Sequence, residues 1–439
     1  MRSDIVIVGG GAGGLELACK LGRKLGPSKV TLVDSRLYHI WKPSLHEVAA
    51  GTLDIHQEGL SYQMLAHDNG FNFVFGPMTA LDAASKSLTV GAIVSASDKD
   101  EVLPERRLRY GSLVLAIGST SNYFGVPGAR EHTISLNATE DAERFRLRML
   151  RLMLAAEQEQ EEHDGNGHGQ GAGLDVVIIG GGATGVELAA ELREASGAYV
   201  TYGFDQLDVR RDVRITILEG APRVLAPLPE KVSQAAADLL DKRGIRVVAN
   251  CRVTAIEKDR VIDKDGKVYP SKLCVWAAGI RAPELLESFG LPLAKGGQVE
   301  VDAHLAVKGM PDIYALGDCA ACVDGNGNLV PPRAQAAHQQ ADYLVTTFLR
   351  KHKGHAPQKT PYEYRDYGSL VSVGRSTSVG SLMGSLRGAS WFVQGWMARL
   401  MYTSLHLMHH RAVLGTMRTG VLAVARFLVR RATPLVKLH

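Results

Sequence analysis

The stretch from Asp4 to Asp34, DIVIVGGGAGGLELACKLGRKLGPSKVTLVD, decides the fold. It opens with a short apolar, β-branched run and passes into the glycines of residues 9–14. An amphipathic helical pattern follows, and a second apolar run closes on Asp34. This order of buried strand, glycine turn, helix and strand is typical of a βαβ unit in a parallel sheet. The sequence therefore predicts an α/β fold organised around this unit.

The spacing of the glycines also predicts a ligand. Gly9 allows the tight turn, Gly11 lets the backbone approach a pyrophosphate, and Gly14 lets the helix pack close to the sheet. The first N–H groups of the helix attract phosphate, and Asp34, twenty residues after Gly14, can accept hydrogen bonds from a ribose. A lone G-x-G-x-x-G is weak evidence because glycines gather in many turns. In this full context it indicates a dinucleotide site.

The same pattern occurs a second time from Leu174. LDVVIIGGGATGVELAAELRE supplies a strand, the glycines Gly180, Gly182 and Gly185, and a helix. The next apolar strand, VRITILEG, ends at Glu219, which is more than the usual twenty or so residues past the last glycine. We assign the excess to an insertion at residues 197–212 between the helix and the strand.

The acid that ends the second unit predicts which nucleotide it takes. A carboxylate at Glu219 accepts a hydrogen bond from the 2′-hydroxyl of NADH and repels the 2′-phosphate of NADPH. Arg223 follows four residues later and would soften this choice. The sequence therefore predicts a preference for NADH.

Each half also contains an apolar strand that runs into a glycine. LVLAIGS reaches Gly118 in the first half, and WAAGI brings Ala278 and Gly279 to the corresponding place in the second. A third strand, PDIYALGD, runs into Gly317 and Asp318, where a carboxylate suits a polyol such as the ribitol of FAD. Capping of a helix is the simpler role for that aspartate, and both can hold. Two nucleotide sites in one chain imply electron transfer between them.

Composition excludes several classes of function. The 50 Lys and Arg residues nearly balance 46 Asp and Glu, the net charge is +4, and no nucleic-acid-binding motif occurs. Five scattered cysteines fit a reducing cytoplasm, and the chain enters a core strand by Ile5, which leaves no room for a signal peptide. No run of eighteen uncharged apolar residues occurs, so we expect no membrane-spanning helix.

Two other features have a less favoured functional interpretation, one as a metal site and one as a redox-active pair. The segment EEHDGNGHGQGAG, residues 161–173, lacks the ligand spacing of a zinc site, so we expect a mobile surface linker and no bound metal. Cys319 and Cys322 form a C-x-x-C pair that could be redox-active. They follow a flavin-type Gly-Asp and have no partner motif, which makes that role the less favoured one.

The tail from Leu386 changes character. It contains no Asp or Glu, and arginines interrupt apolar stretches that include Trp391, Phe392 and Trp396. Aromatic side chains of this kind suit the headgroup level of a bilayer, and a basic amphipathic segment too interrupted to span it describes a monotopic anchor. We therefore predict binding to an anionic membrane surface. A basic dimerisation arm is the alternative.

With these features placed, the chain resembles the two-dinucleotide-binding-domain flavoproteins and, within them, the type II NADH dehydrogenases, which are single-subunit NADH:quinone oxidoreductases. The general features are the two glycine loops, LVLAIGS, WAAGI and IYALGDCA. Narrower ones are WKPSLHEVAAG (residues 41–51), the AQAAHQ run (334–339) and the basic tail. The glycine-rich linker and the insertion before Asp212 depart from the family pattern.

The resemblance implies a function and a set of site residues. Electrons would pass from NADH through FAD to a membrane quinone, without proton pumping, on the cytoplasmic face of the inner membrane, and a homodimer is common in the family. The FAD site would comprise Gly9, Gly11, Gly14, Asp34, Lys42, Gly118, Gly317 and Asp318. The NADH site would comprise Gly180, Gly182, Gly185, Glu219, Ala278 and Gly279. Glu187 would lie between nucleotide and flavin as a proton- or charge-transfer residue, and Gln335 and Gln339, on one helix face, would border the quinone.

The predicted architecture is therefore α/β, with two Rossmann-like dinucleotide-binding domains and a C-terminal helical membrane-anchoring region. The FAD-binding domain is predicted at residues 1–150 and 299–385, and the NAD(H)-binding domain at 174–298. Residues 151–173 are predicted as the glycine-rich linker and residues 386–439 as the tail. The sequence does not identify the quinone.

Three other functions share parts of this pattern. A sulfide:quinone oxidoreductase has the same fold and tail but needs reactive cysteines facing the flavin. A soluble ferredoxin- or rubredoxin-type reductase has no use for the tail. A non-enzymatic, NADH-binding redox sensor would reduce its flavin slowly and retain NAD⁺, so turnover separates it from a dehydrogenase.

Overall fold

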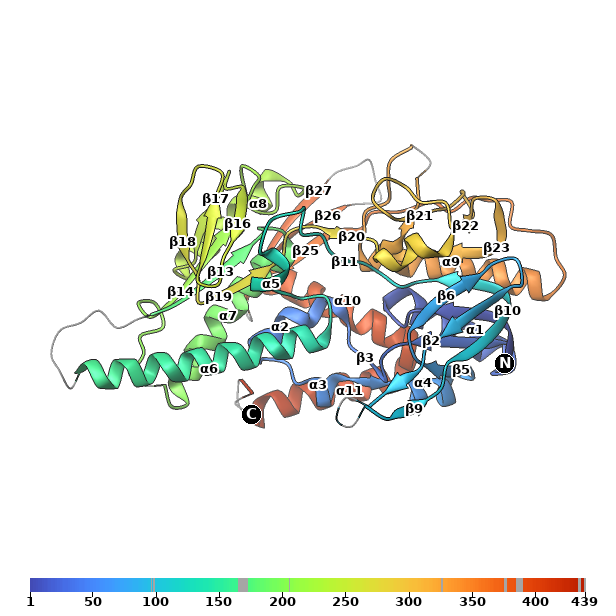
Figure 1. The fold of residues 1–439 in the computed structure, drawn as a ribbon, viewed down its shortest axis with the longest axis horizontal. Coiled ribbons are helices and arrows are strands. Elements are labelled where there is room, and N and C mark those ends of the chain that lie inside the picture. The colour runs from blue at the N-terminus through green and yellow to red at the C-terminus, as the bar shows by residue number, and fades with distance from the viewer. Residues whose placement is uncertain are drawn as a thin grey trace.

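The computed structural model describes residues 1–95, 97, 99–164, 173–204, 206–324, 327–374, 377–383, 390–432 and 436–437. Two α/β lobes lie side by side, and two C-terminal helices lie across the middle of the molecule (Figure 1). Residues 165–172 of the predicted linker, Asp205 of the predicted insertion and residues 384–389, where the predicted tail begins, are outside the described ranges.

The first lobe is built on a mainly parallel sheet in the order β22-β23-β10-β1-β2-β5, with β7 and β6 added in antiparallel fashion beside β10. Its strands are β1 (Arg2–Val8), β2 (Val30–Asp34), β5 (Asn72–Phe75), β6 (Met78–Asp82), β7 (Ser87–Val90), β10 (Arg106–Leu115), β22 (Ala306–Val307) and β23 (Met310–Ala315). Its main helices are α1 (Ala12–Leu25), α4 (Tyr62–Asn69) and α9 (Ala334–His352). β1 and β2 lie at the centre because their near-continuous apolar runs are buried on both faces.

The second lobe repeats this plan with a parallel sheet in the order β12-β19-β13-β14-β15. Its strands are β12 (Ile134–Ser135), β13 (Leu174–Ile179), β14 (Val213–Leu218), β15 (Arg246–Val248) and β19 (Leu273–Trp276). Its helices are α2 (Leu45–Ala50), α6 (Thr139–Asp164), α7 (Ala183–Thr201) and α8 (Glu230–Lys242). An antiparallel sheet of β16 (Val253–Ile256), β17 (Arg260–Asp263) and β18 (Val268–Pro270) lies beside it. A hairpin turn at Asp265–Gly266 joins β17 to β18.

Short elements connect the two lobes or lie at their edges. They are β3 (Tyr38–His39), β4 (Leu60–Ser61), β8 (Ile93–Val94), β9 (Glu101–Leu103), β11 (Thr120–Ser121), β20 (Ile280–Arg281), β21 (Val299–Glu300), β24 (Ala320–Ala321), α3 (Ile55–Glu58), α5 (Ala129–His132), η1 (Lys42–Ser44), η2 (Glu284–Phe289) and η3 (Gly317–Cys319). β11 and β20 pair in antiparallel fashion, one leaving the first lobe and one returning to it. This pair is the crossing between the lobes.

The C-terminal part is not helical throughout. It forms an antiparallel sheet of β25 (Gly368–Ser372), β26 (Ser378–Met383) and β27 (Ser390–Gly395), followed by α10 (Trp396–Leu414) and α11 (Thr416–Ala432). The expectation of a helix at Trp391 and Phe392 is therefore wrong, because the aromatic and β-branched run SWFVQG pairs with β26 as a strand. Within the described residues, no helix is both long and apolar enough to cross a membrane.

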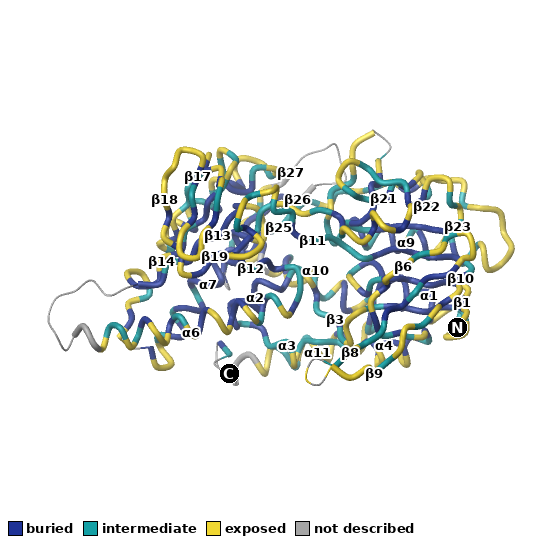
Figure 2. The backbone as a smooth tube through the Cα atoms, in the orientation of Figure 1, coloured by how far each residue is buried: buried dark blue, intermediate teal, exposed yellow. Residues whose placement is uncertain are grey.

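The buried residues form a large core in each lobe (Figure 2), and they correct the predicted boundary at residue 150. That position lies inside α6, whose Phe145, Met149 and Met153 pack into the core of the second lobe. Val48 of α2 packs there as well. The sequence suggests a boundary there because of the glycine-rich composition that follows, whereas the chain changes lobes earlier, at β11.

Two predicted loops are also shorter than expected. α6 continues to Asp164, so residues 151–164 of the predicted linker are helical, in keeping with the charged helix that the sequence pattern of residues 138–161 indicates. α7 continues to Thr201, so the first residues of the 197–212 insertion lengthen that helix rather than forming a loop. At the end of α6 a run of good helix formers, LAAEQEQEE, continues the helix, whereas the end of α7, GAYVT, has weak helix formers, and its Tyr199 is held by packing in the core of the second lobe.

Candidate functional site

The two glycine loops have the same geometry. Gly9 and Gly180 have φ of +103° and +107°, a region that favours glycine. A Cβ at Gly14 would lie 2.0 Å from the Gly9 oxygen, and a Cβ at Gly185 would lie 2.0 Å from the Gly180 oxygen. Each helix can therefore pack this closely on its turn only with glycine.

The middle glycine of each loop faces open space instead. A Cβ built on Gly11, or on Gly182 in the second loop, would meet no atom within 4 Å. Each of these glycines precedes the first residue of its helix, α1 or α7, and neither helix has a side-chain cap. Free N–H groups at a helix start beside an open approach fit a pyrophosphate.

The acid at the end of the second strand is held in the same way in both units. The Asp34 carboxylate accepts the backbone N–H groups of Gly10 at 2.6 Å and Arg36 at 2.8 Å. The Glu219 carboxylate accepts those of Gly181 at 2.5 Å and Ala221 at 2.6 Å. Each acid is thus fixed beside its loop while its remaining lone pairs stay available to a ribose.

The residue expected to soften the choice of nucleotide does not face the acid. The Arg223 guanidinium donates to the carbonyl oxygens of Ala226 at 2.9 Å and Leu228 at 3.0 Å. Its charge is held by the backbone that follows β14, so the local geometry supports the NADH preference predicted from Glu219.

The predicted ribitol end of the first site is a small polar cluster. Asp318 lies in η3 and is half-buried, and its carboxylate accepts the Ser119 hydroxyl at 2.7 Å. Lys42 of η1 donates to the Ser119 carbonyl at 3.2 Å. Burial lowers the pKa of Lys42, and the Asp318 charge opposes that shift. Gly118 and Gly317, both at positive φ, end the strands that carry this cluster.

The strand-end residues of the second site lie at the second glycine loop. A Cβ at Gly180 would be 2.8 Å from the backbone nitrogen of Ala278, and a Cβ at Gly279 would strike the Phe124 ring at 2.5 Å. The Ala278 carbonyl accepts the indole N–H of Trp276 at 2.7 Å. These contacts bring the predicted set around one loop.

Glu187 is buried between three elements. Its Oε1 accepts the Ser372 N–H of β25 at 2.9 Å, and its Oε2 lies 3.6 Å from Nδ1 of His46 in α2. His46 is 3% exposed, and its Nε2 is buried without a hydrogen-bond partner. A buried carboxyl and imidazole thus lie together just past the second glycine loop.

Gln335 and Gln339 are four residues apart on α9, as predicted, but their side-chain amides form hydrogen bonds with main-chain groups. Gln335 donates to the Gly368 carbonyl at 3.0 Å and accepts the Tyr367 N–H at 3.2 Å. Gln339 donates to the Arg365 carbonyl at 2.8 Å and accepts the Arg365 N–H at 3.0 Å. They therefore hold the segment that leads into β25, the strand that binds Glu187.

Sequence reasoning missed several residues that complete these sites. Gln340 is 1% exposed, and its side-chain oxygen accepts the Gly317 N–H at 2.7 Å. Ser119 orients Asp318, and Tyr62 donates to the Gly10 carbonyl at 2.7 Å. Ser119 stands directly after Gly118 and could have been noticed, whereas Gln340 and Tyr62 reach their partners only through tertiary packing.

The cysteines are unsuited to redox chemistry. All five are buried and free. Burial raises the pKa of Cys19 and Cys274 to about 12 and the pKa of Cys319 and Cys322 to about 11. Because thiolates are the reactive form, thiols with such pKa values are poor nucleophiles. Within the described residues, no group of three or more His, Cys, Asp or Glu side chains could hold a metal ion.

Comparison with known families and curated proteins gives a consistent result. Residues 3–341 match the model of the pyridine nucleotide-disulphide oxidoreductase family. The type II NADH:quinone oxidoreductase of Haemophilus influenzae is 37% identical, over 99% of this chain and 100% of that protein. The type II NADH:quinone oxidoreductase Ndh of Mycobacterium tuberculosis is 30% identical, over 92% of this chain and 84% of that protein.

Solved structures share the fold. The Plasmodium falciparum NDH2 in complex with NADH covers 100% of both chains with a TM-score of 0.81 at 20% identity. The sulfide:quinone oxidoreductase of Aquifex aeolicus covers 94% of this chain and 92% of its own, with a TM-score of 0.70 at 19% identity. At these identities the structures support the architecture alone, and the sequence relatives carry the family.

Proposed function

The chain belongs to the pyridine nucleotide-disulphide oxidoreductase family and within it to the type II NADH:quinone oxidoreductases, and on that premise we propose that it binds FAD along its first glycine loop and NADH along its second. The observation that carries this proposal is the duplicated geometry of the two loops. In each, glycine is required at the turn and at the helix contact, and an acid is fixed beside the loop by two backbone N–H groups.

The two sites are assigned to different nucleotides by what surrounds them. The first loop has the polar cluster of Asp318, Ser119 and Lys42, which suits the hydroxyls of ribitol. The second has the strand-end backbone of Ala278 and Gly279 and the buried pair Glu187 and His46. The first site therefore suits the resident flavin and the second the exchangeable nicotinamide.

The overall reaction takes up one proton for each two-electron transfer, because NADH, a proton and a quinone give NAD⁺ and a quinol. Bound FAD supplies the redox chemistry by accepting a hydride and passing two electrons on. The protein orients both nucleotides, and Glu187 is the buried carboxyl placed to hold a proton beside the second loop. The reaction needs no pumped proton.

Gln335 and Gln339 contribute by position rather than by direct contact. Their amides fix residues 365–368, and this segment leads into β25, whose Ser372 N–H binds Glu187. In this arrangement α9 of the first lobe sets the place of a carboxyl in the second. Family membership is the ground for placing both glutamines at the border of the quinone site, and their contacts support a role in holding this segment.

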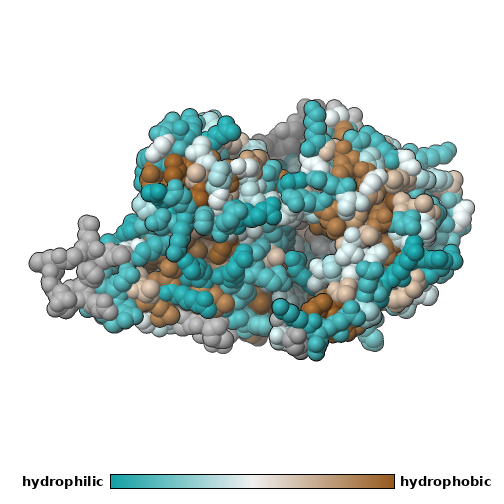
Figure 3. All heavy atoms as spheres, in the orientation of Figure 1, coloured by the Kyte–Doolittle hydropathy of each residue, from teal (hydrophilic) through white to brown (hydrophobic). Residues whose placement is uncertain are grey.

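The tail suits attachment to a membrane surface. α11 exposes Met417, Val421, Val424 and Leu428, which are 85%, 65%, 61% and 60% exposed, and their spacing places them on one face of the helix. Trp396 at the start of α10 is 73% exposed. The face drawn in Figure 3 is mainly hydrophilic, with apolar groups in patches over both lobes. An exposed apolar stripe on a helix without acids fits an anionic bilayer surface.

The location and assembly follow from the same premise. The enzyme would lie on the cytoplasmic face of the inner membrane, where NADH is available and free thiols such as these five persist. A homodimer is the assembly we propose for the detergent-solubilised enzyme, and sedimentation analysis tests it.

A sulfide:quinone oxidoreductase is the nearest rival, and the thiols argue against it. That reaction needs a nucleophilic cysteine at the flavin, whereas the two cysteines near the predicted flavin site, Cys319 and Cys322, are buried with raised pKa values. The Cys319 Sγ donates to backbone carbonyls of the first lobe.

A matched pair of glycine variants tests the assignment of the two sites. Gly14→Ala places a Cβ 2.0 Å from the Gly9 oxygen and should lower the affinity for FAD by about tenfold or more. Gly185→Ala makes the same clash in the second loop and should leave FAD bound while weakening NADH binding by a similar factor. Flavin absorbance per protein and an NADH titration measure the two effects.

The control is Gly197→Ala in α7, where a Cβ meets no atom within 4 Å. This variant should bind both nucleotides normally. Loss of FAD from Gly185→Ala, or retention of FAD by Gly14→Ala, would contradict the assignment.

A further inference from the structure

A chain of buried hydrogen bonds joins the tail to the first glycine loop. Nδ1 of His409 in α10 lies 2.8 Å from Oε1 of Glu16 in α1, and its Nε2 lies 2.9 Å from Nε2 of His39. Nδ1 of His39 lies 2.9 Å from the carbonyl oxygen of Gly10. His409, His39 and Glu16 are 5%, 4% and 1% exposed. The tail helix thus reaches the loop through one intermediate side chain.

The partners of these rings fix where the protons are. A carbonyl oxygen only accepts, so His39 carries its proton on Nδ1 and, when neutral, accepts at Nε2. His409 can then donate from Nε2 to His39, and its Nδ1 lies within hydrogen-bond distance of the Glu16 carboxylate. Burial and the neighbouring His409 hold the pKa of His39 well below its ordinary value. Although burial alone would raise it, hydrogen bonds from His338 and His409 hold the pKa of Glu16 well below its usual range.

Glu16 is also where three helices meet. Its Oε2 accepts from Nδ1 of His338 in α9 and lies 3.2 Å from the Lys20 ammonium in its own helix. α1, which carries the loop's N–H groups at its start, is therefore tied to α9 and to α10 through a single buried carboxylate. A change at His409 reaches both the loop and the helix behind it.

The second glycine loop has no comparable link in the described part of the chain. The Gly181 carbonyl, which corresponds to that of Gly10, accepts the backbone N–H of Leu225 at 2.8 Å. The first loop instead receives two side chains at Gly10, His39 and Tyr62. The second loop is thus held by its own domain's backbone, and the first by two side chains, of which His39 connects to the tail.

We propose that His409 is a positioning residue for the FAD-binding loop. Through His39 it fixes the Gly10 carbonyl, and with it the peptide that turns the next N–H groups toward the pyrophosphate. This inference rests on the proposed function, because it takes the first loop as the FAD site. It adds that docking of α10 and retention of FAD are thermodynamically linked, so each stabilises the other.

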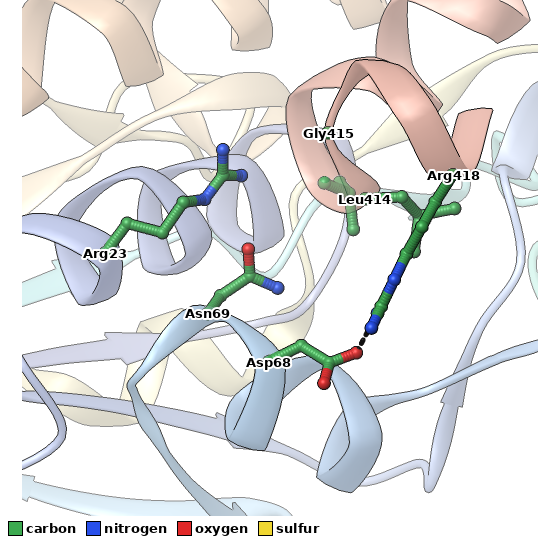
Figure 4. A pocket seen from close by; sticks show the side chains of 7 residues that line it. Arg23, Asp68, Asn69, Leu414, Gly415 and Arg418 are labelled. Atoms are coloured by element: carbon green, nitrogen blue, oxygen red, sulfur yellow. Dashed lines mark hydrogen bonds and ion pairs between the residues drawn. The ribbon is translucent and has the colours of Figure 1, made fainter. Parts of the chain in front are cut away.

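Other contacts also hold the tail against the first lobe, so the His409 hydrogen bonds are one part of a larger interface. Arg418 of α11 pairs with Asp68 of α4, on the wall of a cavity of about 290 Å³ at the turn between α10 and α11 (Figure 4). Arg23 lines the same cavity and donates to the Ala412 carbonyl. These contacts hold the tail in place without touching the glycine loop. We therefore expect these contacts to keep the tail in place when His409 is changed.

Two amide substitutions separate the two hydrogen bonds of His409. In His409→Asn the amide nitrogen takes the place of Nδ1 and keeps the donor to Glu16 but not to His39. In His409→Gln it takes the place of Nε2 and keeps the donor to His39. FAD titration of the flavin-depleted full chain should show roughly tenfold weaker binding in His409→Asn and a smaller loss in His409→Gln.

The matched control is His410→Phe. His410 is also buried in α10, but its ring packs on His406, and among the described residues it makes no hydrogen bond to the first glycine loop. This variant should bind FAD as the wild type does. NADH affinity, measured in parallel, should be unchanged in all three variants because the second loop is held independently. Equal FAD affinity in His409→Asn and His409→Gln, or a parallel loss of NADH affinity, would overturn the proposal.

Hydrogen exchange on the unmodified chain gives a second test that needs no variant. Adding FAD to the flavin-depleted protein should slow amide exchange in residues 400–412 of α10, and no change there would refute the linkage. The result is separable from the proposed function itself. If Gly14→Ala keeps its FAD, the site assignment fails; if Gly14→Ala loses FAD while His409→Asn keeps it, only this inference fails.

Discussion

In the proposed function single side chains set the chemistry of both sites, and the two strand-end acids are the example. Asp34 and Glu219 were predictable because each ends an apolar strand after a glycine loop and its helix. Their hydrogen bonds to Gly10 and Gly181 follow from the same local geometry. The direction of Arg223 was not predictable, because its carbonyl partners are brought to it by the turn after β14.

Charge at Glu219 should decide between the two nicotinamide nucleotides. Glu219→Gln removes the repulsion of a 2′-phosphate while keeping the size of the side chain. The ratio of kcat/KM for NADPH to that for NADH should rise by about tenfold. Glu230→Gln, on the exposed start of α8, is the control and should leave the ratio unchanged. A ratio within twofold of the wild type in Glu219→Gln would show that the selectivity lies elsewhere.

The carboxyl of Glu187 should matter for turnover more than for binding. Glu187→Gln keeps a hydrogen-bond acceptor for the Ser372 N–H but cannot hold a proton at this position. Quinone-dependent kcat should fall by about tenfold or more, with the NADH KM within about twofold of the wild type. Glu194→Gln, two turns further along α7 and paired with Arg243, is the control. Unchanged turnover in Glu187→Gln would remove this residue from the mechanism.

At the scale of elements, β25 and α10 connect parts that the sequence does not show as neighbours. β25 carries the Ser372 N–H to Glu187 and is itself held by Gln335 of α9. The sequence placed the glutamines on one helix face correctly, but it did not indicate that their amides bind the main chain of residues 365–368. The hydrogen-bond partners of these amides depend on how residues 365–368 pack, and no local sequence pattern predicts that packing.

Two buried histidines where α10 packs on the first lobe, His410 and His39, predict a loss of stability in acid. Burial, followed by the charge of His409, lowers the pKa of His410 from 6.5 to about 4. Below pH 6.5 the unfolded chain binds a proton at this residue that the folded chain does not, so stability falls as the pH drops toward 4. The shift corresponds to ~3 kcal/mol, and buried His39 adds to it in the same direction.

Thermal unfolding between pH 7 and pH 4.5 checks this expectation. The wild-type Tm should fall across that range, and His410→Phe should show a smaller fall because it removes one group that must be charged on unfolding. An identical pH dependence in the variant and the wild type would mean that His410 does not contribute.

At the scale of the molecule, the two halves repeat one plan, and the repeat was visible in the sequence. The glycine loops, the strand-end acids and the alternation of strands with helices all follow from local patterns. The packing of α2 and α6 was not visible: both helices precede the second glycine loop in the sequence, yet both pack into the core of the second lobe. Apolar residues on a helix show that it packs, but not on which lobe.

The tail should hold the molecule on a membrane through the exposed stripe of α11. Val424→Glu together with Leu428→Glu places two negative charges on that stripe and should abolish flotation with vesicles that contain an anionic lipid. Val268→Glu, at an exposed apolar residue of β18, is the control and should float normally. Retention of the double variant on the vesicles would show that another surface binds the membrane.

The most direct test is steady-state oxidation of NADH by the purified, FAD-loaded chain in detergent, with and without a soluble quinone. We expect fast oxidation that requires quinone, one quinol formed for each NADH consumed, and a clear preference for NADH over NADPH. Bleaching of the flavin by NADH followed by no quinone turnover would contradict the assigned reaction and point to a different electron acceptor.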